Sequence, residues 1–192
     1  MRWAVLLKGV NVGGNRKIPM ADLRVFLAGL GLTDVKTLLA SGNAVFDTDE
    51  KDAAKLEAHL EREAKAKLGL DTGWLLRSHA DLVAVVKANP FPDAAKEHPS
   101  HLLVHFHRDP FPMNLLPLAH DGPERLAAHG RELFVDYPDD VGHSKLPQSM
   151  NKAKFPKLAT ARNWNTVLKL HEMSERQGPR HQGIEGPRKK AK

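Results

Sequence analysis

Cysteine is absent from the 192 residues of this chain, and aromatic residues make up only 6% of them. Without thiols the chain can form no disulfide, thiolate nucleophile, zinc ribbon or iron–sulfur cluster. The apolar run at the start, residues 3–7, is ended by Lys8. Such a run is too short for a signal-peptide core or a membrane-spanning helix. We therefore expect a cytoplasmic protein without a membrane partner.

Positive charge is concentrated towards the C-terminus. The chain has 29 lysines and arginines against 23 aspartates and glutamates, a formal net charge of +6. Residues 1–140 are slightly acidic, whereas residues 141–175 and 176–192 are both strongly basic. Residues 177–192 are rich in glycine and proline and poor in large apolar side chains, a composition typical of a disordered tail. Because residues 1–175 taken together carry a formal charge of only +1, the basic character of the whole chain says little about the folded part.

The first half of the chain predicts four strands and two helices. Short apolar runs are typical of buried strands, and apolar residues three and four apart are typical of helices. The expected elements are a strand at 3–8, a helix at 19–30, strands at 35–39 and 43–46, a helix at 50–68 and a strand at 73–77. This order, βαββαβ, is that of a ferredoxin-like unit.

The second half repeats this order less clearly, without a residue-level repeat between the halves. It predicts a helix capped by Ser78, a strand at 101–107, a short helix near 113–118, a hairpin at 124–137, a helix within 144–154, a strand at 158–162 and a helix at 163–175. We therefore predict an α+β fold of two ferredoxin-like subdomains, each a two-layer α/β plait. The predicted boundaries are 1–77 and 78–176, followed by the disordered basic tail 177–192.

Four short motifs carry a resemblance to a known family. They are LKGVNVGG at 7–14, SGN at 41–43, NPF at 89–91 and TARNWNTV at 160–167. Together they resemble the bacterial family catalogued as the domain of unknown function numbered sixteen ninety-seven. The resemblance implies an α+β fold of two ferredoxin-like subdomains and implies no reaction. Lys8 stands where the family usually has arginine, which keeps the positive charge but loses the planar bidentate fork.

Two loop motifs are candidate ligand sites. The loop after the first strand holds Asn11, Gly13 and Gly14 beside Lys8. Backbone N–H groups at such glycines and at a helix start can hold an anion. The loop matches neither the Walker pattern nor the dinucleotide fingerprint, and a plain strand-to-helix turn is the alternative. Ser41 and Asn43 belong to a second turn, where a tight hairpin equally explains them.

The segment before the last helix is the third candidate. Asn163 is predicted to cap that helix, which leaves Arg162 and Asn165 unexplained. An arginine with two amides at a helix start is typical of anion recognition, although such residues also serve the backbone alone. The predicted ligand site is listed in full as Lys8, Asn11, Gly13, Gly14, Ser41, Asn43, Arg162, Asn163 and Asn165.

Other patterns are more typical of surface residues than of a catalytic or metal site. A basic surface of Lys145, Lys152, Lys154 and Lys157 is either a solvated helix face or a docking surface for phosphates. Three histidines share one face of the strand at 101–107, and without a carboxylate in that run we expect an exposed polar sheet face rather than a metal site. Ser149 and Lys152 match a Ser-x-x-Lys pattern without its companion motifs. We assign no catalytic residue, metal or cofactor, and whether the chain is an enzyme stays open.

These patterns favour binding of a small anionic or phosphorylated ligand. A second hypothesis is a nucleic-acid-associated protein that uses the tail and the basic C-terminal region without sequence preference. A third is a dimerisation or scaffold module, such as a homodimer, whose polar motifs only cap and turn.

Overall fold

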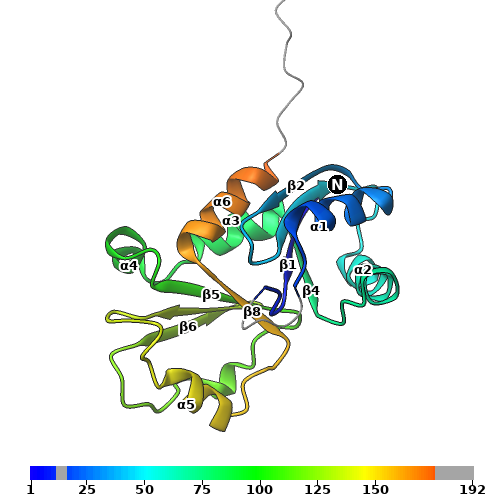
Figure 1. The fold of residues 1–192 in the computed structure, drawn as a ribbon. Coiled ribbons are helices and arrows are strands. Elements are labelled where there is room, and N and C mark those ends of the chain that lie inside the picture. The colour runs from blue at the N-terminus through cyan, green and yellow to red at the C-terminus, as the bar shows by residue number, and fades with distance from the viewer. Residues whose placement is uncertain (12–16, 176–192) are drawn as a thin grey trace, which may run out of the picture.

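The computed structural model describes residues 1–11 and 17–175, which form two four-stranded sheets with helices (Figure 1). Gly13, Gly14 and the predicted tail therefore lie outside the described residues. None of the helices in the described ranges is long and apolar enough to cross a bilayer.

The N-terminal lobe, defined by the first sheet and its two helices, has the predicted element order. It consists of β1 (Arg2–Leu7), α1 (Met20–Gly29), β2 (Thr33–Leu38), β3 (Asn43–Asp47), α2 (Ala53–Leu68) and β4 (Trp74–Ser78). The sheet order is β2-β3-β1-β4 with every neighbouring pair antiparallel. Asp52 caps α2 by accepting a hydrogen bond from the Lys55 N–H, and Gly69 ends the helix in the left-handed conformation, as such caps typically do.

The C-terminal lobe, defined by the second sheet with α5, repeats this topology with shorter helices. After α3 (His79–Lys87) and α4 (Pro92–Glu97), its elements are β5 (Leu102–His107), the 3-10 helix η1 (Met113–Leu115), β6 (Arg125–His129), β7 (Glu132–Asp136), α5 (Leu146–Lys152) and β8 (Ala159–Asn163), followed by α6 (Trp164–Ser174). The sheet order is β6-β7-β5-β8. The predicted α+β fold of two ferredoxin-like subdomains is confirmed, while the boundaries 1–77 and 78–176 stay a prediction.

Three apolar clusters hold these layers together. The outer cluster of the N-terminal lobe joins Val5 and Phe46 to α1 and α2. The central cluster joins the inner faces of both sheets, through Leu6 and Phe106 among others, to α3 and α6, which lie side by side above the second sheet in Figure 1. Each fully buried leucine or phenylalanine contributes about 1.5–3 kcal/mol relative to exposure. The shared central cluster therefore fixes the two sheets relative to each other.

The histidine face of β5 differs from the prediction. His107 is only 3% exposed and His105 is half-buried, so the expected exposed polar face was wrong. A third apolar cluster, which includes Leu133, Phe155 and Leu146 of α5, covers this side of the second sheet. Strand alternation shows which residues share a face, but the covering segments are remote in sequence.

Two local differences have simple causes. The predicted elements include no helix at 92–97, yet Pro92 begins α4 there, because the first helical turn accepts a residue without an N–H. The segment between β5 and β6 forms only a 3-10 helix. Its prolines at 110, 112 and 117 lack the N–H groups that a longer helix needs.

Candidate functional site

Arg162 is the centre of the predicted site. It lies on β8 and is 7% exposed. Its guanidinium donates to Asn43 Oδ1 at 2.5 Å, to Thr160 Oγ1 at 2.7 Å and to the carbonyl of Ala161 at 2.8 Å. It also donates to the carbonyls of Leu7 and Ser41, both at 2.9 Å. All five N–H donors of the guanidinium therefore have acceptors. We call Arg162 with these acceptors and Lys8 the Arg162 junction.

The acceptors of Arg162 are all neutral. Asn43 is fully buried, and its amide donates to the carbonyl of Leu38 and to Ser41 Oγ. Within the described part of the chain, no carboxylate lies within ion-pair distance of Arg162. Burial consequently lowers the pKa of Arg162 to about 10. A buried cation without a counter-charge is energetically unfavourable, because desolvation is offset only by dipoles.

The first predicted loop packs against this junction through Asn11. The Asn11 amide donates to the carbonyl of Ile18 at 2.9 Å and to that of Ala40 at 2.6 Å, while its oxygen accepts from the Ile18 N–H at 2.8 Å. Asn11 has a φ of 55°, a conformation in which asparagine is enriched. Its amide therefore ties the loop to the β2–β3 turn and has no donor left for a ligand.

Lys8 is half-buried at the end of β1. Its Nζ donates to the carbonyl of Lys157 at 2.5 Å, and it forms no ion pair with any described residue. An ammonium group has three N–H donors. Lys8 therefore retains donors that a ligand can accept from.

The two remaining asparagines lie at the start of α6. Asn163 accepts from the N–H and the hydroxyl of Thr166, so the predicted cap is present. Asn165 is exposed in the first turn. The structure thus brings Ser41, Asn43 and Arg162 into direct contact. Asn11 contacts Ala40, next to Ser41, and the side chain of Lys8 contacts Lys157. A ligand-binding role for any of the nine residues stays a prediction.

Sequence reasoning missed a second buried arginine. Arg77 lies on β4, is 0% exposed and donates from Nε to Glu132 Oε1 at 2.7 Å. Its other nitrogens donate to the carbonyls of Leu76 at 2.8 Å and His107 at 2.6 Å. Burial lowers the pKa of Arg77, and the charge of Glu132 opposes this shift. We call Arg77 with these acceptors and Arg108 the Arg77 junction.

The two junctions occupy equivalent positions in the two lobes. Arg77 pairs with Ala4 of β1, and Arg162 pairs with Val104 of β5. Two residues further along, Leu6 pairs with Asn43 and Phe106 pairs with Glu132. Asn43 and Glu132 are therefore equivalent, and so are Leu7 and His107, the residues that follow Leu6 and Phe106. Arg162 donates from Nε to the Asn43 side chain and from a terminal nitrogen to the Leu7 carbonyl. Arg77 donates in the same way to the Glu132 side chain and the His107 carbonyl.

The equivalence extends beyond the arginines. A cap follows each one directly, Ser78 for α3 and Asn163 for α6. Lys8 and Arg108 are the next equivalent pair, one residue past Leu7 and His107. Arg108 contacts Glu57 at 2.9 Å and also Glu61. Burial acts to lower the pKa of Arg108, but these carboxylates outweigh it and raise the pKa. Both cations of the Arg77 junction thus have carboxylate partners, and neither cation of the Arg162 junction has one among the described residues.

A cleft of about 340 Å³ lies where the two lobes meet at Lys8 and Arg108. Its lining also includes Glu61 and Asp71. Glu61 is engaged by Arg108 and by the Trp74 N–H, and Asp71 pairs with Lys65. Lys8 therefore lines a cleft whose carboxylates already bind other cations.

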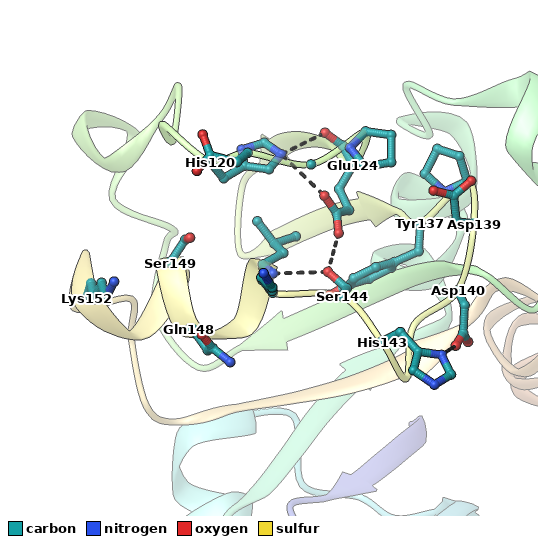
Figure 2. Close-up of a pocket in the computed structure, with 16 residues that line it drawn as sticks. His120, Glu124, Tyr137, Asp139, Asp140, His143, Ser144, Gln148, Ser149 and Lys152 are labelled. Atoms are coloured by element: carbon teal, nitrogen blue, oxygen red, sulfur yellow. Dashed lines mark hydrogen bonds and ion pairs between the residues drawn. The ribbon is translucent and has the colours of Figure 1, made fainter.

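A larger cavity of about 390 Å³ lies in the C-terminal lobe and is lined by residues that belong to neither junction. Figure 2 shows these lining residues. Glu124 points into it, accepts from the Ser144 hydroxyl and has its Oε2 3.7 Å from His120 Nε2. Burial and the charge of Glu124 raise the pKa of Tyr137 to about 12. Lys145 and Lys152 line the same cavity together with four carboxylates, those of Asp121, Glu124, Asp139 and Asp140.

The predicted basic surface is therefore divided. Lys145 and Lys152 share the cavity with these carboxylates, whereas Lys154 and Lys157 are exposed on the segment that leads to β8. A phosphate-docking role for the four lysines stays a prediction. Over residues 1–11 and 17–175, no group of three or more histidine or carboxylate side chains is arranged to hold a metal ion.

Comparisons with known proteins agree with the fold. A family model described as "Protein of unknown function (DUF1697)" matches residues 1–134. A solved structure, that of the conserved bacterial protein SP0830 from Streptococcus pneumoniae, is similar with a TM-score of 0.71 and 25% sequence identity. The similarity covers 91% of this chain and 98% of that one. No curated protein matches the chain.

Proposed function

Because the chain belongs to the DUF1697 family, whose description names no activity, we propose its function from geometry: it binds a small anionic or phosphorylated ligand at the Arg162 junction. Lys8 donates to the ligand directly. Arg162, held by Ser41 and Asn43, supplies buried positive charge, and Asn11 positions the loop. Gly13 and Gly14 belong to the proposed site on sequence grounds, as do Asn163 and Asn165 at the start of α6.

The observation that carries this proposal is that, among the described residues, the Arg162 junction contains no counter-charge. The Arg77 junction neutralises its two cations with Glu132, Glu57 and Glu61. The Arg162 junction keeps the same hydrogen-bond arrangement around its arginine with neutral acceptors only. An anion bound beside Lys8 supplies the counter-charge that Arg162 does not receive from the described residues, where the desolvation of this buried cation is otherwise offset only by dipoles.

Inorganic phosphate tests the proposal on the full chain. We expect the melting temperature to rise with phosphate at constant ionic strength, because a ligand that binds only the folded state stabilises it by RT ln(1 + [L]/Kd). Amide shifts in ¹H–¹⁵N spectra should concentrate at residues 7–11, 17–18 and 40–43. Equal melting curves in phosphate and chloride, with no such shifts, would refute anion binding.

Two lysine variants make the test specific. Lys8→Gln removes the proposed contact and should reduce the phosphate response several-fold. Lys96→Gln removes an exposed lysine of α4 and should leave the response unchanged. A response equally weakened in both variants would indicate a general surface-charge effect rather than a site.

The other hypotheses stay predictions with their own tests. Binding of nucleic acid through the basic C-terminal region predicts gel shifts that weaken steeply with salt. A homodimer or scaffold predicts a doubled mass in solution. A cytoplasmic location is likewise a prediction, which localisation of a tagged full-length chain would check.

A further inference from the structure

The side chains at positions 43 and 132 have equivalent places in the two junctions but differ in charge. Both side chains accept from the Nε of a buried arginine, at 2.5 Å for Asn43 and 2.7 Å for Glu132. Asn43 is 0% exposed and Glu132 is 8% exposed. One junction therefore contains its own anion, and the other contains an amide in the same place.

We propose that Asn43 is the specificity-determining residue that keeps the Arg162 junction receptive to an anion, and that Glu132 closes the Arg77 junction as a built-in anion. This inference rests on the proposed function, because it concerns the same site. The chain thus has one open anion site and one latent site. Whether a junction is the open or the latent site depends on one side chain, the amide of Asn43 or the carboxylate of Glu132.

Hydrogen bonding explains why an amide serves at position 43. The Asn43 amide nitrogen donates to the Leu38 carbonyl at 3.0 Å and to Ser41 Oγ at 2.9 Å, while its oxygen accepts from Arg162. An amide therefore satisfies both the acceptors of the turn and the Nε donor of Arg162 without adding charge. An aspartate at 43 keeps the acceptor for Arg162, supplies a negative charge and places an oxygen against the Leu38 carbonyl.

The latent site is tested by Glu132→Gln, which keeps an acceptor for Arg77 but removes the charge. We expect this variant to melt at a lower temperature than the parent in low salt. We also expect a larger phosphate-induced rise in melting temperature, measured by phosphate titration at constant ionic strength. Glu97→Gln, at an exposed carboxylate of α4, is the matched control. A phosphate response in Glu132→Gln equal to that of the parent overturns the latent site.

The open site is tested by Asn43→Asp, with Asn151→Asp on the exposed side of α5 as its control. We expect Asn43→Asp to lose the phosphate response and Asn151→Asp to retain it. If the parent responds to phosphate and Asn43→Asp responds equally, the role of Asn43 is wrong while the proposed function stands. If the parent does not respond, the proposed function fails, and a response gained only in Glu132→Gln would still support the switch at position 132.

Discussion

The two lobes share topology, strand register, a buried arginine on the last strand and a helix cap directly after it. They differ in what surrounds the arginine. Arg77 faces a carboxylate, a histidine carbonyl and the ring of Phe106 at 5.4 Å, whereas Arg162 faces only neutral oxygens. Both lobes keep the same hydrogen-bond arrangement around the arginine, but only the Arg77 junction balances its charge with a carboxylate. The hydrogen bonds therefore form the junction in either case, whereas the counter-charge is what distinguishes the two lobes.

The largest expected effect separates the two arginines. Arg77→Met should lower the free energy of unfolding by about 3–5 kcal/mol, because it leaves Glu132 as a buried carboxylate without a partner. Arg162→Met should cost less, since it leaves only neutral acceptors and removes an uncompensated buried cation. Urea denaturation of both variants measures the difference. A loss in Arg162→Met equal to or above that in Arg77→Met contradicts the charge argument.

Acid should affect the C-terminal lobe more than the N-terminal lobe. Burial, assisted by the charge of His107, lowers the pKa of His105 to about 4, and its equivalent in the first sheet is Val5. The unfolded chain binds this proton near pH 6.5. Stability should therefore fall as the pH drops from about 6.5 towards 4, because the unfolded state binds more protons in that range.

His105→Val tests this difference by installing the residue of the other lobe. The fall in melting temperature between pH 7 and pH 4.5 should become smaller in this variant. His129→Val, at the exposed end of β6, should behave like the parent. A fall of the same size in His105→Val would show that other groups control the acid response.

The two lobes also differ in the residue of the hairpin turn that accepts from β1 or β5, which is Gly42 in the first lobe and Arg131 in the second. The Leu7 N–H donates to the carbonyl of Gly42, and the His107 N–H donates to that of Arg131, so Gly42 and Arg131 are equivalent. Gly42 has a φ of 76°, and a Cβ there would lie 2.3 Å from Val10 Cγ2. Gly42→Ala should therefore destabilise the protein by about 1–3 kcal/mol. Gly29→Ala, where a Cβ meets nothing within 4 Å, is the control, and equal thermal unfolding of both variants would disprove the strain.

The smallest effects concern the helix caps. Ser78→Ala and Asn163→Ala should each cost about 1 kcal/mol, because each leaves a helix N–H without its acceptor. Ser78→Ala should cost slightly more, since Ser78 also forms a capping box with Asp81. Chemical denaturation measures both. Two variants as stable as the parent would show that water replaces the caps.

The features that could be predicted from the sequence are those that depend on residues close together in the chain. The element order follows from periodicity, and the cap at Asn163 follows from residues three positions apart. The acceptors of Arg162 are different, because Asn43 and Leu7 lie 119 and 155 residues away. No local pattern indicates such a pairing. The equivalence of Asn43 and Glu132 was hidden for a similar reason, since strand register relates them and their side chains differ.

The long sequence separation between Arg162 and its acceptors has a consequence for folding during synthesis. Its partners Leu7, Ser41 and Asn43 leave the ribosome more than a hundred residues before it does. A nascent chain can complete the first sheet early, but β5 lacks its neighbour β8 and the junction lacks its cation until residue 162 has emerged. In a partly synthesised chain the proposed anion site is therefore incomplete until β8 and residue 162 have emerged.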